Sequence, residues 1–414
     1  MPDASHPAHA TAWFEQPWAV ALAGLLAIAV AMGVGRFAFT PLLPMMLHDG
    51  VVDLAQGSWL ATANYIGYLA GAVACTALPW VAPRLYARWG PATLARAGLV
   101  ATVVLTAAMA LPLAATWPTL RFAAGVASAF VLLNVAAWCM VRLALLGQPT
   151  MGAVIFAGAG VGIVLTGLAA SAMVAFGWRA ASGWLLFAVL ALLWCLPIWP
   201  VVRGAAARAP ASAAHAGHPA ATPAAPPLAR ALHALGYGLA GLGYIVTATF
   251  LPVIARSALP PGSPWPDLFW PMFGVGATVG ALLSARTPLP WDRRWLLAAC
   301  YLVQAAGIAI GLWSPTASGF AAGSVLLGLP FLALVFYAMQ VAREQWPASA
   351  DSFMSLITAA YGIGQIVGPP ITAWLLERSG QAQGFTRALS FAAAALLAGA
   401  LIYAASALRW RRAE

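Results

Sequence analysis

The chain has 414 residues, of which 63% are hydrophobic and 7% are charged, and its formal net charge is +10. Since a soluble domain carries about 25% charged residues, this composition excludes an ordinary soluble fold and predicts a protein embedded in lipid. All twenty basic residues are arginines, and they cluster in short gaps between apolar runs. This pattern is typical of membrane loops and argues against a nucleic-acid partner.

Twelve apolar runs are long enough, at roughly 20 residues, to cross a bilayer as helices. They lie at about 18–46, 58–79, 92–114, 117–141, 151–176, 181–202, 230–254, 267–285, 295–313, 316–341, 352–376 and 386–408. With the N-terminus inside, fourteen arginines flank the inner ends of these runs and only four flank the outer ends. This bias predicts a multi-pass protein of the cytoplasmic (inner) membrane with both termini in the cytoplasm.

A stretch rich in alanine and proline interrupts the apolar runs in the middle of the chain, and it cannot form a packed core. We therefore predict five segments. They are a cytoplasmic N-terminal tail (1–17), a six-helix half (18–202), a cytoplasmic linker (203–229), a second six-helix half (230–408) and a cytoplasmic C-terminal tail (409–414). Parallel halves joined by a cytoplasmic linker are a standard transporter architecture, with a substrate site between them.

The two halves resemble each other in sequence. GVGRFAFTPLLP at 33–44 aligns without gaps with GLGYIVTATFLP at 241–252, so that Pro44 matches Pro252. FAAG at 122–125 recurs at 320–323 in the same order along the second half. These matches predict a duplicated six-helix unit.

Arginines inside apolar runs are the first candidate site residues, because a charge within a bilayer costs a few kcal/mol or more. Arg36 lies eighteen residues beyond Trp18, about 27 Å along a helix, and Thr40 shares its face. Arg36 would either contact an anion or bind carbonyl groups that Pro41 and Pro44 leave free. Arg121, at the start of the fourth run, would either contact the same anion or clamp two helices together.

Uncharged polar residues inside the runs would either bind a substrate or hydrogen-bond helices to one another. The candidates are Asn64, Tyr68, Asn134, Tyr244, Gln340, Tyr361 and Gln365. Tyr244 aligns with Arg36 in the repeat. No acidic residue lies within a run, so a coupling proton would have to be carried elsewhere, with His48, Asp49 and Asp267 at run ends as candidates.

Glycine and proline residues in the runs are predicted to allow close helix packing, bending or gating. They are Gly67, Gly71, Gly125, Gly276, Gly280, Gly364, Gly368, Pro41, Pro44, Pro252 and Pro369. The four cysteines all fall in apolar runs without metal-ligand spacing, and no phosphate-binding loop is present. We therefore expect no metal and no cofactor.

Several motifs resemble those of the major facilitator superfamily. LRFAAG at 120–125 is similar to its fourth-span arginine motif, and YGIGQIVGPP at 361–370 is similar to its glycine- and proline-rich motif. The loop PRLYARWGPATLAR at 83–96 lacks the usual aspartate. GVGRFAFTPLLPMM at 33–46 and ANYIGYLAGA at 63–72 resemble the YbfB/YjiJ-type branch. The resemblance implies alternating access by rocking of two six-helix halves.

The predicted fold is an all-α membrane protein with twelve transmembrane helices in two pseudo-symmetric halves. The predicted function is secondary active transport of a small organic anion, because Arg36 and Arg121 have no acidic neighbour in sequence. Export of a hydrophobic or weakly polar compound is the first alternative. A membrane-embedded transferase using His48 and Asp49 is the second, and we do not expect an enzyme. The expected partners are a small-molecule substrate, membrane lipid and a coupling proton, with the protein acting as a monomer.

Overall fold

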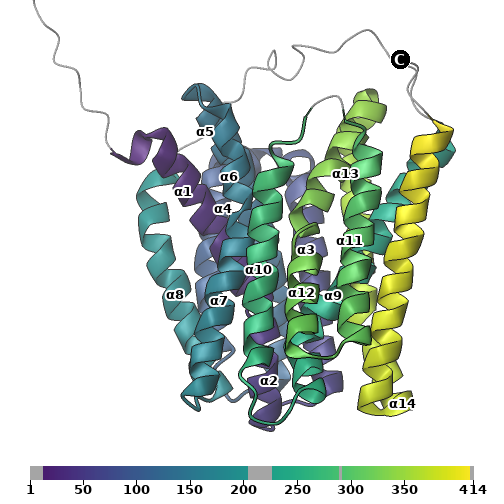
Figure 1. The fold of residues 1–414 in the computed structure, drawn as a ribbon. Helices are drawn as coiled ribbons and strands as arrows, with labels where there is room; N and C mark the ends of the chain where they lie inside the picture. Colours follow the sequence, from purple (N-terminus) through teal and green to yellow (C-terminus); the bar gives the residue numbers. More distant parts are fainter. Residues whose placement is uncertain (1–12, 204–225, 289–290, 411–414) are drawn as a thin grey trace, which may run out of the picture.

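The computed structural model describes residues 13–203, 226–288 and 291–410, and within them every regular element is a helix. The N-terminal helix set consists of α1 (Pro17–Ile28), a π-helix (Ala29–Phe37), α2 (Phe39–His48), α3 (Leu54–Val81), α4 (Pro83–Ala108), α5 (Trp117–Leu145), α6 (Gly152–Phe156), α7 (Gly158–Ala175) and α8 (Ala180–Val201). The C-terminal helix set consists of α9 (Pro227–Ala258), α10 (Trp265–Ser284), α11 (Arg293–Trp313), α12 (Ala317–Gly328), α13 (Phe331–Gln345) and α14 (Ala350–Arg409). The long helices run roughly along one common direction as a single bundle (Figure 1).

Large apolar side chains lie on the outside of this bundle. Leu192, Leu193 and Leu196 of α8 and Leu401 of α14 are all more than half exposed. In water such a surface would aggregate, whereas in a bilayer it faces hydrocarbon. The exposed face therefore confirms the composition argument for a membrane protein.

Ten helical segments of the described chain are long and apolar enough to cross a membrane. α3 is not among them, and Pro347–Arg409 counts once although Gly380 breaks its helix with φ of 72°. A positive φ is open to glycine without steric cost. Most helix bounds lie within a few residues of the predicted ranges, but α4 (Pro83–Ala108) begins nine residues and ends six residues before the predicted 92–114. The number of twelve spans stays a prediction.

α3 forms near its predicted range of 58–79 and has a capped first turn. Its first turn is fixed by a capping box, in which the Asp53 side chain accepts from the Gln56 backbone N–H and the Gln56 side chain accepts from that of Asp53. These two bonds satisfy N–H groups that a helix start leaves unpaired. Asn64 and Tyr65 lower the apolar character of the helix, and both are buried.

The first span is distorted, as expected, but over a longer stretch than the prolines alone imply. A nine-residue π-helix occupies Ala29–Phe37 and ends where Pro41, which has no N–H, cannot bond to the carbonyl of Phe37. π-helical turns are rare and often occur at functional sites. Gly33 in this segment packs directly on Gly162 of α7, so the widened backbone lies against a neighbouring helix.

Predicted packing glycines lie where helix backbones touch. A Cβ on Gly67 would lie 1.9 Å from the carbonyl oxygen of Phe122, and one on Gly125 would lie 2.1 Å from that of Asn64. Backbone or side-chain atoms of a neighbouring helix also lie within 3 Å of the Cβ position at Gly71, Gly276, Gly280, Gly364 and Gly368. Pro252 lies inside α9, and Pro369 lies inside α14.

The predicted segment boundaries are only partly visible. Residues 1–12, 204–225 and 411–414 lie outside the described residues, and they include most of both tails and of the predicted linker 203–229. α9 begins at Pro227, so the last three residues of that linker are helical. Proline is favoured in the first helical turn because its missing N–H has no partner there. The division into two six-helix halves stays a prediction.

Candidate functional site

Arg36 lies buried in the π-helix, with 3% of its surface exposed. Its Nη2 donates a hydrogen bond to Oε1 of Gln365 in α14. Gln365 Nε2 in turn donates to the hydroxyl of Tyr244 in α9 at 3.0 Å. Arg36 and Tyr244 occupy equivalent positions in the two aligned sequence repeats, so the Gln365 amide bridges equivalent positions of the two helix sets.

Aromatic rings enclose this hydrogen-bonded chain. The Arg36 Cζ atom lies 4.1 Å from the ring centroid of Tyr68 and 5.3 Å from that of Tyr65. Tyr244 packs on Phe331 at 4.9 Å and on Tyr361 at 5.8 Å between ring centroids. A guanidinium over an aromatic face gains about 0.5–2 kcal/mol, more when water is excluded. The rings therefore hold Arg36 in place without neutralising its charge.

Arg121 of α5 is also buried, with 2% exposed, and it contacts the backbone of the π-helix. Its Nη1 donates to the Gly35 carbonyl at 3.4 Å, and its Nη2 donates to the Arg36 carbonyl at 3.2 Å. The Asn64 amide also binds the Gly35 carbonyl, at 3.3 Å, and the Arg121 carbonyl, at 2.9 Å. These bonds favour the clamp interpretation of Arg121, which fixes the helix segment that carries Arg36.

Within the described part of the chain, neither guanidinium is paired with a carboxylate. Among the described residues, the ion pairs within 4.0 Å join His48 to Asp49, Arg256 to Asp267 and Arg294 to Asp292. The Nε atoms of Arg36 and Arg121 are buried without a hydrogen-bond partner. An uncompensated buried charge costs several kcal/mol, which an anion bound beside it would partly recover. The site is therefore electrostatically suited to an anion.

Two further hydrogen bonds join the helix sets near Arg36. Thr40 Oγ1 donates to the Ala248 carbonyl at 2.8 Å, and the Tyr65 and Thr249 hydroxyls lie 3.0 Å apart. Thr40 and Ala248 are again equivalent positions of the repeat. Sequence reasoning missed Tyr65 and Thr249 as site residues, although Tyr65 adjoins Asn64 and Thr249 aligns with Pro41.

Two predicted site residues lie in other environments. The Asn134 amide donates to the Phe130 carbonyl within α5 at 2.8 Å and to Cys75 Sγ at 3.5 Å. Gln340 Oε1 accepts from Arg293 Nε at 2.7 Å. Neither residue hydrogen-bonds to Arg36, and their roles in substrate binding stay predictions.

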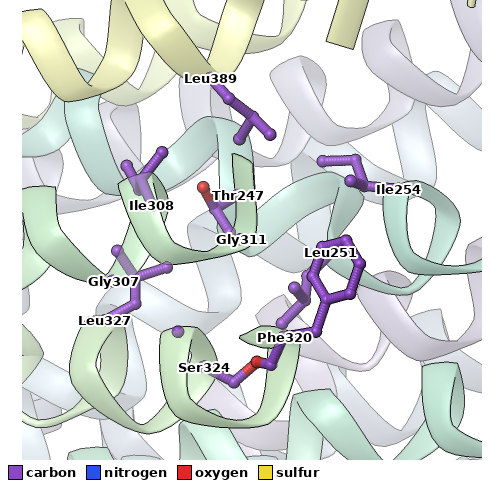
Figure 2. Close-up of a pocket in the computed structure, with 11 residues that line it drawn as sticks. Thr247, Leu251, Ile254, Gly307, Ile308, Gly311, Phe320, Ser324, Leu327 and Leu389 are labelled. Atoms are coloured by element: carbon purple, nitrogen blue, oxygen red, sulfur yellow. The ribbon is translucent and has the colours of Figure 1, made fainter. Parts of the chain in front are cut away.

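A small cavity lies inside the C-terminal helix set, between α9, α11, α12 and α14 (Figure 2). Its volume is about 20 Å³, on a measure by which one water needs about 10–15 Å³. The buried Thr247 hydroxyl lines it and has no hydrogen-bond partner. Ligand pockets are usually 300–1,000 Å³, so this cavity is too small for an organic substrate.

Replacing Arg121 with methionine is expected to lower the free energy of unfolding by about 2–3 kcal/mol. Two charge-assisted hydrogen bonds to buried carbonyls would be lost, and relief of the buried charge would offset part of that loss. Thermal and denaturant unfolding of the detergent-purified variant would measure this change. Arg378→Met is the control, since Arg378 is exposed on α14. Unchanged stability with lost substrate binding would instead make Arg121 a ligand contact.

Solved structures with a similar fold are those of a transporter. The crystal structure of a mutant of nucleoside transporter NupG matches with a TM-score of 0.70 and 14% identity, covering 94% of this chain and 99% of that one. A second crystal structure of nucleoside transporter NupG matches with a TM-score of 0.67 and 14% identity, covering 95% and 99%. No curated protein matches the chain.

The bundle and its apolar outer surface are those of a multi-pass membrane protein, and a family match identifies it as a transporter of the major facilitator superfamily. A family model described as an uncharacterised MFS-type transporter YbfB matches residues 28–404. The chain belongs to this family. The resemblance stated from the sequence, and the all-helical major facilitator fold that it implied, are therefore confirmed.

Proposed function

We propose that the protein is a secondary active transporter that works by alternating access and carries a small organic anion. The observation that carries this proposal is the buried guanidinium of Arg36, which lies where the two helix sets meet and has no carboxylate partner among the described residues. In alternating access a central site between two rocking sets opens to each side in turn. A cation at that meeting point would bind an anion in both orientations.

The surroundings of Arg36 favour a monoanion with an apolar body. Arg121 uses both Nη atoms on backbone carbonyls, so one guanidinium is left to bind the anionic group. The adjacent surfaces are the rings of Tyr68, Tyr244 and Phe331, and aromatic rings bind apolar groups by area and packing. A monocarboxylate with an aromatic or aliphatic body matches this combination better than a di- or tricarboxylate.

The arginine distribution and the exposed apolar surface support a proposal for the location of the protein. We propose that the protein lies in the cytoplasmic membrane with both termini in the cytoplasm, and that it functions as a monomer surrounded by lipid. Of the candidate carriers of a coupling proton, Asp267 forms an ion pair with Arg256. Asp49 Oδ2 accepts from the Ala180 backbone N–H at the start of α8.

Export of a hydrophobic or weakly polar compound is a second candidate, favoured by the stacked rings beside the site. Tyr361 stacks on Tyr237 at 4.6 Å between centroids. A transferase has less support, because Asp49 is engaged with α8 and the His48 side chain is 91% exposed. The transporter family and fold also argue against an enzyme.

A ligand-stabilisation screen would test the proposal. Thermal unfolding of the purified protein would be followed with monocarboxylates, dicarboxylates, amines, nucleosides and neutral aromatic compounds. A ligand at 100 times its Kd stabilises by about 2.7 kcal/mol, and we expect this response from monocarboxylates only. Stabilisation by uncharged aromatic compounds but by no acid would support the exporter and contradict the anion proposal.

A further inference from the structure

The Gln365 amide occupies the place where an anion would contact Arg36. Gln365 is buried, with 3% exposed. Its Oε1 accepts from Arg36, and its Nε2 donates to the Tyr244 hydroxyl at 3.0 Å. Both ends of the amide are therefore engaged, one by Arg36 and the other by Tyr244. These two residues occupy equivalent positions of the repeat in the two helix sets.

A carboxylate has the same planar shape as this amide but accepts at both ends. One carboxylate oxygen would take the place of Oε1 on Arg36. The other would accept from the Tyr244 hydroxyl, because that hydroxyl can rotate and donate. The present bond joins a charged donor to a neutral acceptor, whereas a carboxylate would bring a full opposite charge to a buried site, where the attraction between charges is stronger than in water. A carboxylate would therefore compete for Arg36.

The backbone around Gln365 is weakened at the same point. Pro369 and Pro370 follow it by four and five residues in α14. Since proline has no N–H, the helix bonds to the carbonyls of Gln365 and Ile366 cannot form. Proline inside a helix is a common cause of a kink or hinge, so the segment that carries the amide can move more easily than a regular helix.

We propose that Gln365 is a placeholder for the carboxylate of the substrate, and that the substrate binds Arg36 by displacing it. This inference rests on the proposed function, since it assumes an anionic substrate. Gln365 belongs to the C-terminal helix set and Arg36 to the N-terminal set. Displacement therefore breaks a contact between the sets when the substrate arrives, which links binding to their relative movement.

Two variants of Gln365 should change anion binding in opposite directions. Gln365→Glu supplies a tethered carboxylate, so it should raise the thermal midpoint and weaken binding of an added monocarboxylate at least about tenfold. Gln365→Ala removes the competitor and leaves a space the size of acetate. Acetate, which lacks the apolar body expected of the substrate, should then raise the thermal midpoint of this variant more than that of the wild type. Acetamide should have a smaller effect, because it lacks the charge.

Two controls distinguish binding of acetate to Arg36 from stabilisation by acetate that merely fills an empty cavity. Gln304→Ala empties a buried glutamine site in α11, where the amide donates to the Leu327 carbonyl at 3.1 Å. Acetate should not stabilise it, because no guanidinium contacts that amide. The double variant Arg36→Gln/Gln365→Ala should also lose the acetate response.

The outcomes separate the two proposals. If monocarboxylates stabilise the wild type through Arg36, but both Gln365 variants respond as the wild type does, the placeholder is wrong and the anion transporter stands. If no organic anion stabilises the wild type, the proposed function fails. The Arg36-dependent acetate response of Gln365→Ala then decides on its own whether the amide fills a carboxylate site. Its absence would overturn the inference, and its presence would support it.

Discussion

Arg36→Gln is expected to abolish binding and transport of the organic anion while leaving the protein folded. The variant removes the single guanidinium that faces the Gln365 amide and keeps a side chain able to hydrogen-bond in its place. Removing one partner of a buried charged pair costs about 2–5 kcal/mol, which corresponds to a loss of roughly 30-fold or more in affinity. Uptake into proteoliposomes and ligand-induced thermal stabilisation would both measure the loss.

Arg378→Gln is the matched control for this experiment. Arg378 also lies over an aromatic ring, 4.5 Å from the centroid of Trp374, but it is exposed and far along α14 from Gln365. Its replacement should leave uptake unchanged. Arg36→Lys should retain part of the activity, because lysine keeps the charge but lacks the planar fork. Wild-type uptake of every accepted anion by Arg36→Gln would remove the basis of the proposed function.

Gly280→Ala is expected to be among the most destabilising single substitutions in the bundle. A Cβ at this position of α10 would lie 1.7 Å from the carbonyl oxygen of Leu329. A backbone atom cannot move aside as a side chain can, so the helices must separate. Overpacking of this kind costs about 1–3 kcal/mol and sometimes more. Gly67→Ala should behave similarly, with its Cβ 1.9 Å from the Phe122 carbonyl oxygen.

Gly311→Ala should change stability in the opposite direction. Its added Cβ would meet the Phe320 ring at 3.6 Å, an ordinary contact. Alanine is favoured over glycine inside a helix by about 0.5–1 kcal/mol. Thermal midpoints of the three purified variants would show the contrast. If the thermal midpoints of Gly280→Ala and Gly311→Ala were equal, the close contact between Gly280 and the Leu329 carbonyl would be absent in the purified protein.

Much of the fold could be predicted from the sequence, because apolar length and loop charge are local properties. The bounds of α8, Ala180–Val201, differ from the predicted 181–202 by one residue at each end. The alignment of the two sequence repeats also pairs Arg36 with Tyr244. Helix bounds and internal duplication need no knowledge of which helices are neighbours.

The partners of the buried charges were decided only by the tertiary structure. Arg36 and Gln365 are separated by 329 residues, and no local pattern joins them. Each residue added along a helix turns the side chain by about 100°, so a partner depends on how every helix is rotated and placed. The π-helix at Ala29–Phe37 changes that rotation further. The sequence thus determined that arginines without acidic neighbours lie within apolar runs. Packing of the helices determined that one of them binds backbone carbonyls while the other faces the Gln365 amide.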